Sequence, residues 1–227
     1  MGKRSTAIEI LGVSRDSKGK KTDEIIHEEE LIVKLNREIH KFSCIPSDLE
    51  EMIAGNLKSR GIDPSLPQIK KLGGSKFEVN VSGGLFKTPR NCASKKKLTR
   101  SEVFYSVEAL NKNSFLFQKT GCTHVIGICG EKEVFVEDIS RHCAIDKAIG
   151  LAIRDGINLS NSFLISSCRQ TASTIRKAIF CEIPIVISIA AATDLAIKEA
   201  NKYGITLIGF ASAKRFNIYS HDWRIKF

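Results

Sequence analysis

Residues 134–156, VFVEDISRHCAIDKAIGLAIRDG, predict a β-strand, a charged turn and an α-helix in immediate succession. The first three residues are of types that favour strands. The helix is indicated by apolar residues at helical spacing, which are Ile145, Ala148, Ile149 and Ala152. Gly156 can end that helix. A strand that leads directly into a helix is the repeating unit of α/β proteins.

A block of charged and reactive side chains occupies the predicted turn, at residues 137–147. In α/β sheets, ligands bind beyond the carboxyl ends of the strands, and the start of a helix offers free N–H groups and a partial positive charge to an anion. The block is therefore a candidate ligand site. In the alternative interpretation, Asp138, Arg141 and Asp146 satisfy one another and cap the helix.

The chain alternates strands and helices from residue 123 onward. Strands are predicted at 125–128, 134–136, 163–165, 183–189 and 205–210, and helices after His142, from Ala172 and at 195–203. The strands that contain residues 185–187 and 207–208 lack strict alternation of apolar and polar residues, which suits a sheet covered on both faces. This pattern predicts an α/β fold.

The N-terminal part has a mixed pattern. Strands are predicted at residues 31–35 and 77–81, the second ending at a pair of glycines, Gly83 and Gly84. Between them a helix is predicted to begin at Ser47, because Glu50 follows at capping-box spacing. One face of this helix carries Leu49, Met52, Ile53 and Leu57, and Gly61 can stop it.

Composition limits the classes of protein to which the chain can belong. The 227 residues carry a formal net charge of +10, which favours anionic partners such as phosphates, nucleotides, nucleic acid or an acidic protein face. No apolar run is long enough to cross a bilayer, and no cleavage site of a leader is convincing. The seven cysteines have no regular spacing, so reduced thiols are expected, as in a cytoplasmic protein without membrane contact.

A basic segment with one cysteine lies at residues 86–100, which contain many cations and no acid. Such surroundings favour the thiolate of Cys92. A thiolate on an accessible loop can attack a sulfur donor and hold the sulfur as a persulfide. The alternative is a solvated basic loop in which the thiol is incidental.

Several motifs in one order resemble the FdhD family, the sulfurtransferase-like accessory proteins of formate dehydrogenases. The segments are LIVKLN (31–36), PSDLEE (46–51), AGNL (54–57), TGCTH (120–124), EDISRHCAIDK (137–147), SCR (167–169), LIGF (207–210) and RFNIYSH (215–221). Several spaced motifs in one order are far more specific than any single one. The resemblance runs from about residue 28 to the end of the chain.

The resemblance implies a cytidine-deaminase-like α/β sandwich with a smaller N-terminal α+β lobe. We expect a basic, mobile tail at residues 1–27, the N-terminal lobe at 28–86, a basic cysteine loop at 87–100 and the α/β core domain at 101–227. A homodimer is also implied.

The function implied by the resemblance is sulfur transfer. Cys92 matches the family's persulfide carrier, which would receive sulfur from a cysteine desulfurase and deliver it to the molybdenum or tungsten bis-molybdopterin guanine dinucleotide cofactor of the formate dehydrogenase catalytic subunit. The residues expected to contact this cofactor are His124, Asp138, Arg141, His142, Asp146, Lys147, Phe210, Ala211, Ser212, Ala213, Lys214 and Arg215. No structural metal is expected.

The sequence departs from the family pattern at several positions. Lys95 aligns with a second cysteine that the family usually has on the basic loop. Cys122, Ser140 and Cys168 stand where glycines are usual, and a side chain there would narrow a ligand site. The chain can therefore also be a cofactor- or nucleotide-binding relative that has lost the sulfur chemistry.

Other functional classes have less support. Deamination needs H-x-E and P-C-x-x-C motifs, but the residue two positions beyond His124 is Ile126, and no P-C-x-x-C occurs. Soft metal ligands occur at Cys122, His124, Cys129, His142 and Cys143, but their spacing fits no common zinc pattern. A basic nucleic-acid-binding protein remains an alternative, although the scarcity of aromatic residues on the basic segments argues against it.

Overall fold

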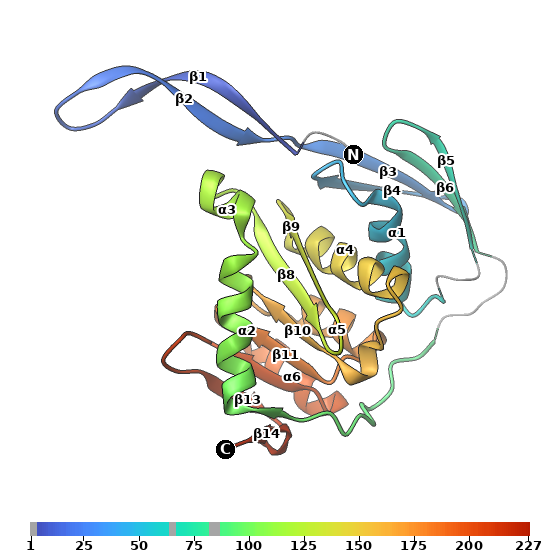
Figure 1. The fold of residues 1–227 in the computed structure, drawn as a ribbon. Helices are drawn as coiled ribbons and strands as arrows, with labels where there is room; N and C mark the ends of the chain where they lie inside the picture. The colour runs from blue at the N-terminus through green and yellow to red at the C-terminus, as the bar shows by residue number, and fades with distance from the viewer. Residues whose placement is uncertain (1–3, 64–66, 82–86) are drawn as a thin grey trace.

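The main sheet of the computed structural model has six strands in the order β13-β12-β11-β10-β8-β9 (Figure 1). Their bounds are β8 His124–Cys129, β9 Glu133–Asp138, β10 Phe163–Ser166, β11 Ile185–Ser188, β12 Thr206–Gly209 and β13 Asn217–Ser220. Strands β10, β11 and β12 are parallel, whereas β8 is antiparallel to both β9 and β10. The structure describes residues 4–63, 67–81 and 87–227.

Helices cover both faces of this sheet. Helices α4 (Arg141–Arg154), α5 (Ala172–Phe180) and α6 (Asp194–Tyr203) pack on one face, and α2 (Arg100–Lys112) packs on the other (Figure 1). All residues of β10, β11 and β12 are buried. The prediction of an α/β fold with a sheet covered on both sides is therefore confirmed.

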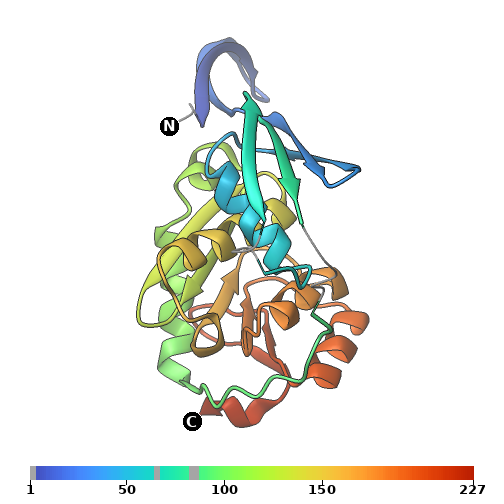
Figure 2. The ribbon, with the colours of Figure 1, turned by 90° about the vertical axis from the view of Figure 1, so that its right-hand side faces the viewer.

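The smaller N-terminal lobe lies at one end of the larger domain (Figure 2). Its sheet has the order β4-β3-β6-β5, with β3 at Glu29–Leu35, β4 at Glu38–Cys44, β5 at Gln68–Gly73 and β6 at Lys76–Asn80. Helix α1 (Leu49–Lys58) buries Met52, Ile53 and Leu57 against this sheet, as its apolar spacing predicts. The expected end of the lobe, with its pair of glycines, lies outside the described residues.

Helix α1 also packs closely against α4 of the core domain. A Cβ atom on Gly55 would lie 1.8 Å from the carbonyl oxygen of Asp146, and one on Gly150 would lie 1.8 Å from that of Glu51. Two glycines thus allow the backbones of the two helices to touch. The capping box predicted at Ser47 is wrong, because the helix starts after Asp48, whose side chain makes no capping hydrogen bond.

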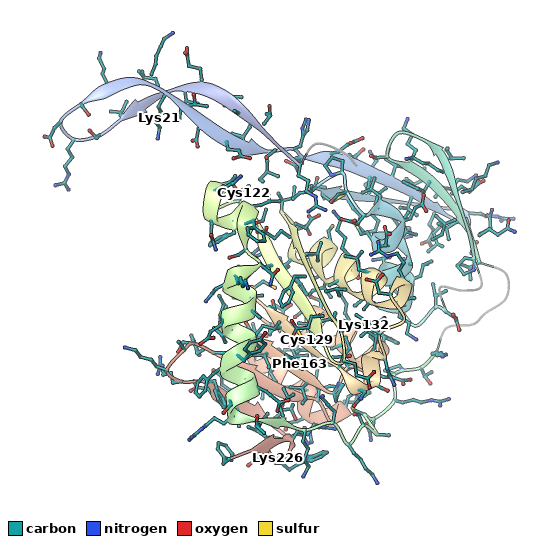
Figure 3. All side chains as sticks on the ribbon, viewed as in Figure 1. Lys21, Cys122, Cys129, Lys132, Phe163 and Lys226 are labelled. Atoms are coloured by element: carbon teal, nitrogen blue, oxygen red, sulfur yellow. The ribbon has the colours of Figure 1, made fainter. Side chains whose placement is uncertain are left out.

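Residues 5–26 form an antiparallel hairpin of β1 (Ser5–Val13) and β2 (Lys18–Ile26) rather than the expected tail. The hairpin extends away from the rest of the molecule, and Lys21 lies along its outer half (Figure 3). At its base, Glu24 accepts a hydrogen bond from Ser5 and pairs with Lys119 of α3 (Phe115–Thr120).

No helix of the described residues is long and apolar enough to span a membrane.

Candidate functional site

The parallel strands give the main sheet two distinct edges. At the edge we call the carboxyl edge, β10 and β11 end at Ser166 and Ser188, and the antiparallel strand β8 begins at His124 beside Asp138. At the opposite, amino edge, the parallel strands begin. The charged block of residues 137–147 lies at the carboxyl edge, where ligands of α/β proteins usually bind. The prediction that it occupies a turn is wrong, because the block spans the end of β9 and the first turns of α4, with only residues 139 and 140 between them.

Asp138 and Lys147 form a fully buried ion pair. The Lys147 Nζ atom lies 2.6 Å from Asp138 Oδ2, and both side chains have 0% exposure. Lys147 also donates to the carbonyl oxygen of Ile45, and Asp138 accepts from the N–H groups of Ile45 and Ser140. Burial raises the pKa of Asp138, and the adjacent Lys147 opposes this effect. The pair joins the N-terminal lobe to the core domain.

Asp146 is buried in a second network between the lobes. Its carboxylate accepts hydrogen bonds from Asn56 and Ser59 of the N-terminal lobe and from Lys177 of α5. The expectation that Asp138, Asp146 and Lys147 contact a cofactor is therefore corrected, because their polar atoms are occupied inside the protein. The alternative that Asp138, Arg141 and Asp146 satisfy one another is also wrong, since Asp138 pairs with Lys147 and Asp146 pairs with Lys177.

A cationic cluster remains at the carboxyl edge. Arg141, His142 and His124 are partly exposed, and Arg169, which follows β10, is exposed. Burial lowers the pKa of His124, and the charges of Arg141 and Arg169 lower it further. Burial likewise lowers the pKa of His142, with added effects of Lys177 and Arg141. The guanidinium groups thus lie close enough to the imidazoles to disfavour their charged forms, as expected of a site shaped for an anion.

Replacing Arg141 with alanine is expected to raise the pKa of both His124 and His142, because one repelling cation disappears. The measurement is a pH titration of the imidazole resonances by NMR. Arg100→Ala removes an exposed arginine at the start of α2 and serves as the control. Equal histidine titrations in wild type and Arg141→Ala would show that Arg141 does not act on either imidazole.

The segment after β12 begins at the carboxyl edge. The N–H groups of Phe210 and Ala211 donate to the carbonyl oxygens of Ala190 and Ser188. Phe210 is 43% exposed and has a left-handed φ of 50°. Ala211 is buried, so its side chain is not accessible to a ligand at the carboxyl edge.

Residues 212–215 form a tight turn in which Ser212 Oγ accepts from the N–H groups of Lys214 and Arg215. Ala213, Lys214 and Arg215 are exposed. The two cations line an open pocket of about 720 Å³ together with the start of α2. Neither Arg141 nor His142 lines that pocket.

Cys92 lies at the amino edge. Its N–H donates to the carbonyl oxygen of Tyr203, at a distance of 2.8 Å, just before β12. The side chain is half-buried and packs against the core. It lines an open pocket of about 860 Å³ whose charged residues are Arg90, Lys95, Lys96, Lys97, Lys226 and Glu182. Five cations and one carboxylate therefore surround the entrance to the thiol.

Arg224 contacts the thiol from inside the protein, although nothing in the local sequence pattern predicts it. It belongs to the short 3-10 helix η2 (Asp222–Arg224) and is 1% exposed. Its Nη2 atom lies 3.6 Å from Cys92 Sγ and 3.3 Å from the carbonyl oxygen of Ser94. The contact joins residues 132 positions apart in the chain, so only the folded structure brings them together.

The structure does not bring Cys92 together with the cationic cluster of the carboxyl edge. Figure 3 shows Lys226, which lines the Cys92 pocket, at one end of the core domain, and Cys122, two residues before His124, at the other. The two edges are separated by the four-residue length of the central strands, roughly 13 Å. The Cys92 thiol and the cationic cluster therefore lie on separate surfaces of the core domain.

The soft metal ligands of the sequence do not converge. His124 and Cys129 lie at opposite ends of β8, and Cys143 is buried, with its thiol near the carbonyl oxygen of Ser43. Among the residues that the structure describes, no group of three or more His, Cys, Asp or Glu side chains is arranged to hold a metal ion.

Comparisons with known proteins agree with the motif order. A model of the FdhD/NarQ family matches residues 73–226. The sulfur carrier protein FdhD of Methanothermobacter thermautotrophicus is 27% identical over 92% of this chain and 94% of its own length. The sulfur carrier protein FdhD of Bacillus pumilus is 30% identical, over 90% of this chain and 91% of its own.

A solved structure has the same fold. It is the crystal structure of a protein from Desulfotalea psychrophila assigned as a formate dehydrogenase accessory protein, with a TM-score of 0.85 and 23% identity. The match covers 99% of this chain and 100% of that one. Since the family model spans more than half of the sequence, the chain belongs to the FdhD/NarQ family.

Proposed function

We propose that this protein is a sulfur carrier that serves the maturation of a formate dehydrogenase. The observation that supports this most directly is the half-buried Cys92 thiol, which lies in a basic pocket and contacts the buried Arg224 guanidinium. Cations beside a thiol favour its reactive thiolate form. Relatives named sulfur carrier protein FdhD that match along most of the chain favour the same role.

Loading would begin at a cysteine desulfurase that carries a persulfide. The Cys92 thiolate attacks the outer sulfur, a new S–S bond forms at Cys92, the S–S bond of the donor breaks, and the donor cysteine leaves as a thiolate. Release as hydrosulfide needs two electrons. A second thiol supplies them by attacking the inner sulfur and remaining as a mixed disulfide with Cys92. Because Lys95 aligns with the family's second cysteine, this thiol would come from outside the loop.

The proposed acceptor is the molybdenum or tungsten bis-molybdopterin guanine dinucleotide cofactor of the client, bound as a substrate. The residues at the carboxyl edge fit its phosphates, because Arg141 and Arg169 are accessible and the neighbouring histidines lie within reach of their charge. Lys214 and Arg215 present two more cations. A cytoplasmic location, a homodimer and the catalytic subunit as client belong to the same proposal.

Cys92→Ala is expected to abolish sulfur loading. The protein is incubated with a cysteine desulfurase and cysteine, and the intact protein and its peptides are analysed by mass spectrometry. One extra sulfur atom should map to Cys92 in the wild type. Cys122→Ala is the matched control, since Cys122 is an exposed thiol distant from the basic pocket.

An active desulfurase that loads a control acceptor but leaves Cys92 unmodified would contradict the proposal. The protein would then be a cofactor-binding relative that uses the carboxyl edge alone. Sulfur found on Cys122, and lost in Cys122→Ala, would show that Cys122 and not Cys92 is the carrier thiol. That outcome would also contradict the proposal.

A further inference from the structure

We infer that Arg224 is the charge partner of the Cys92 anion, both as the free thiolate and as the loaded persulfide. The inference rests on the proposed function of Cys92 and adds a second residue that contacts the reacting sulfur. Arg224 lies near the C-terminus, outside the basic loop whose cations the sequence offers as the obvious stabilisers of the thiolate.

Arg224 carries a buried positive charge that forms no ion pair with a described residue. Arg224 is 1% exposed, and none of the ion pairs between the described residues includes it. Burying a guanidinium without an anion is costly, and proteins normally supply a carboxylate. The ionisable group that Arg224 does contact is the Cys92 thiol. An anionic sulfur would therefore supply the missing negative charge.

Several hydrogen-bond acceptors fix the orientation of the Arg224 guanidinium. Its Nη1 atom donates to the Gly204 carbonyl oxygen at 2.8 Å and to Thr206 Oγ1 at 3.3 Å. Its Nη2 atom donates to Ser94 and Cys92. These acceptors hold the planar group in one orientation beside the sulfur. The Trp223 ring packs on the guanidinium, with 4.1 Å between the Arg224 Cζ atom and the ring centroid, and screens this face from water.

The Arg224 guanidinium also has a spare hydrogen-bond donor. Arg224 Nε is buried and has no hydrogen-bond partner among the described residues. Natively folded proteins leave few buried donors unsatisfied, and the exceptions concentrate where a functional group or an additional ligand completes the site. A guanidinium with more donors than neutral acceptors is suited to an anion that is present only in part of a reaction cycle.

The loop lysines act differently. They line the open pocket, where water screens their charges, and no hydrogen bond between a loop lysine and Cys92 Sγ occurs in the described structure. Their charges are better suited to attract a negatively charged sulfur donor than to stabilise the thiolate. Removal of Arg224 should therefore change the reactivity of Cys92 more than removal of Lys95 does.

The test is the rate at which iodoacetamide alkylates Cys92 as a function of pH, measured peptide by peptide so that Cys122 reports on the same sample. Variants are Arg224→Met, which removes the charge at similar size, Arg224→Lys, which keeps a charge, and Lys95→Met as a control. Circular dichroism establishes that each variant is folded. The measurement needs no sulfur donor and no client.

In Arg224→Met, Cys92 alkylation at about pH 7 should fall about tenfold, because a charge-assisted hydrogen bond to the thiolate is lost. At about pH 10 the rates of wild type and variant should converge, since both thiols are then ionised. Arg224→Lys should react faster than Arg224→Met at neutral pH. Cys122 should react at the same rate in all proteins.

Equal Cys92 profiles in wild type and Arg224→Met would overturn the inference. Should Arg224→Met not fold, Arg224→Gln, which keeps hydrogen-bond donors but carries no charge, takes its place. A Cys92 profile in Arg224→Gln equal to that of the wild type would overturn the inference. A reactive Cys92 that never accepts sulfur would instead contradict the proposed function and leave the role of Arg224 intact.

Discussion

Lys147→Met is expected to destabilise the folded protein by about 3–5 kcal/mol, because it leaves a buried carboxylate without its counter-charge. The loss affects both lobes, since the Lys147 ammonium group also donates to the Ile45 carbonyl oxygen. Protonation of Asp138 offsets part of this loss of stability, because burial already raises the pKa of its carboxyl group. Urea unfolding followed by circular dichroism measures the change in the free energy of unfolding.

The matched control is Lys198→Met, which removes a lysine from the exposed pair with Asp194. Exposed pairs contribute little, so its unfolding midpoint should stay close to that of the wild type. In the double variant Asp138→Asn/Lys147→Met no charge remains at this buried site. It should be more stable than Lys147→Met alone. If Lys147→Met unfolds at the same urea concentration as Lys198→Met, the ion pair is not buried in solution.

Gly55→Ala and Gly150→Ala are each expected to destabilise the protein by about 1–3 kcal/mol or more, because the added methyl group would overlap a backbone carbonyl of the neighbouring helix. In an unobstructed helix, alanine is more favourable than glycine by about 0.5–1 kcal/mol. A net loss of stability therefore reports the helix contact itself. Urea unfolding gives the stability, and limited proteolysis shows whether the N-terminal lobe is released.

Gly19→Ala in the hairpin is the control, since a Cβ atom there would meet nothing within 4 Å. Its unfolding midpoint should match that of the wild type. A stable Gly55→Ala protein with unchanged protease resistance would show that α1 and α4 lie further apart in solution than in the structure.

The buried contacts between the two lobes give a structural role to motifs that resemble a binding site. Within residues 137–147, Asp138 and Lys147 connect the lobes through Ile45, and Asp146 receives hydrogen bonds from both lobes. The Gly55 and Asn56 positions of the AGNL segment serve the same connection. Several residues of these motifs therefore hold the N-terminal lobe against the core domain. Arg141 and His142 are the residues of this block that remain accessible to a ligand.

Some of the architecture can be derived from local patterns. The strands and helices predicted after residue 123 are found close to their predicted places, because apolar periodicity and turn residues act over a few positions. Strand β13 of the same sheet is not among the predicted strands. Helix α2 also has a local signal, since Thr99 and Glu102 form a capping box before its buried apolar face. In contrast, the hairpin at residues 5–26 has no periodic burial to reveal it, because most of its residues are exposed.

The amino-acid order alone establishes the α/β class, the family motifs and Cys92 as the candidate sulfur carrier. Only the tertiary structure separates the charges that are buried in ion pairs from those that face solvent, as Asp138 and Arg141 illustrate. It also places Arg224 beside a thiol 132 residues away and sets Cys92 on the opposite edge of the sheet from Arg141. The physical reason is that desolvation and long-range contact depend on how all elements pack together, whereas strand and helix signals depend on neighbouring residues.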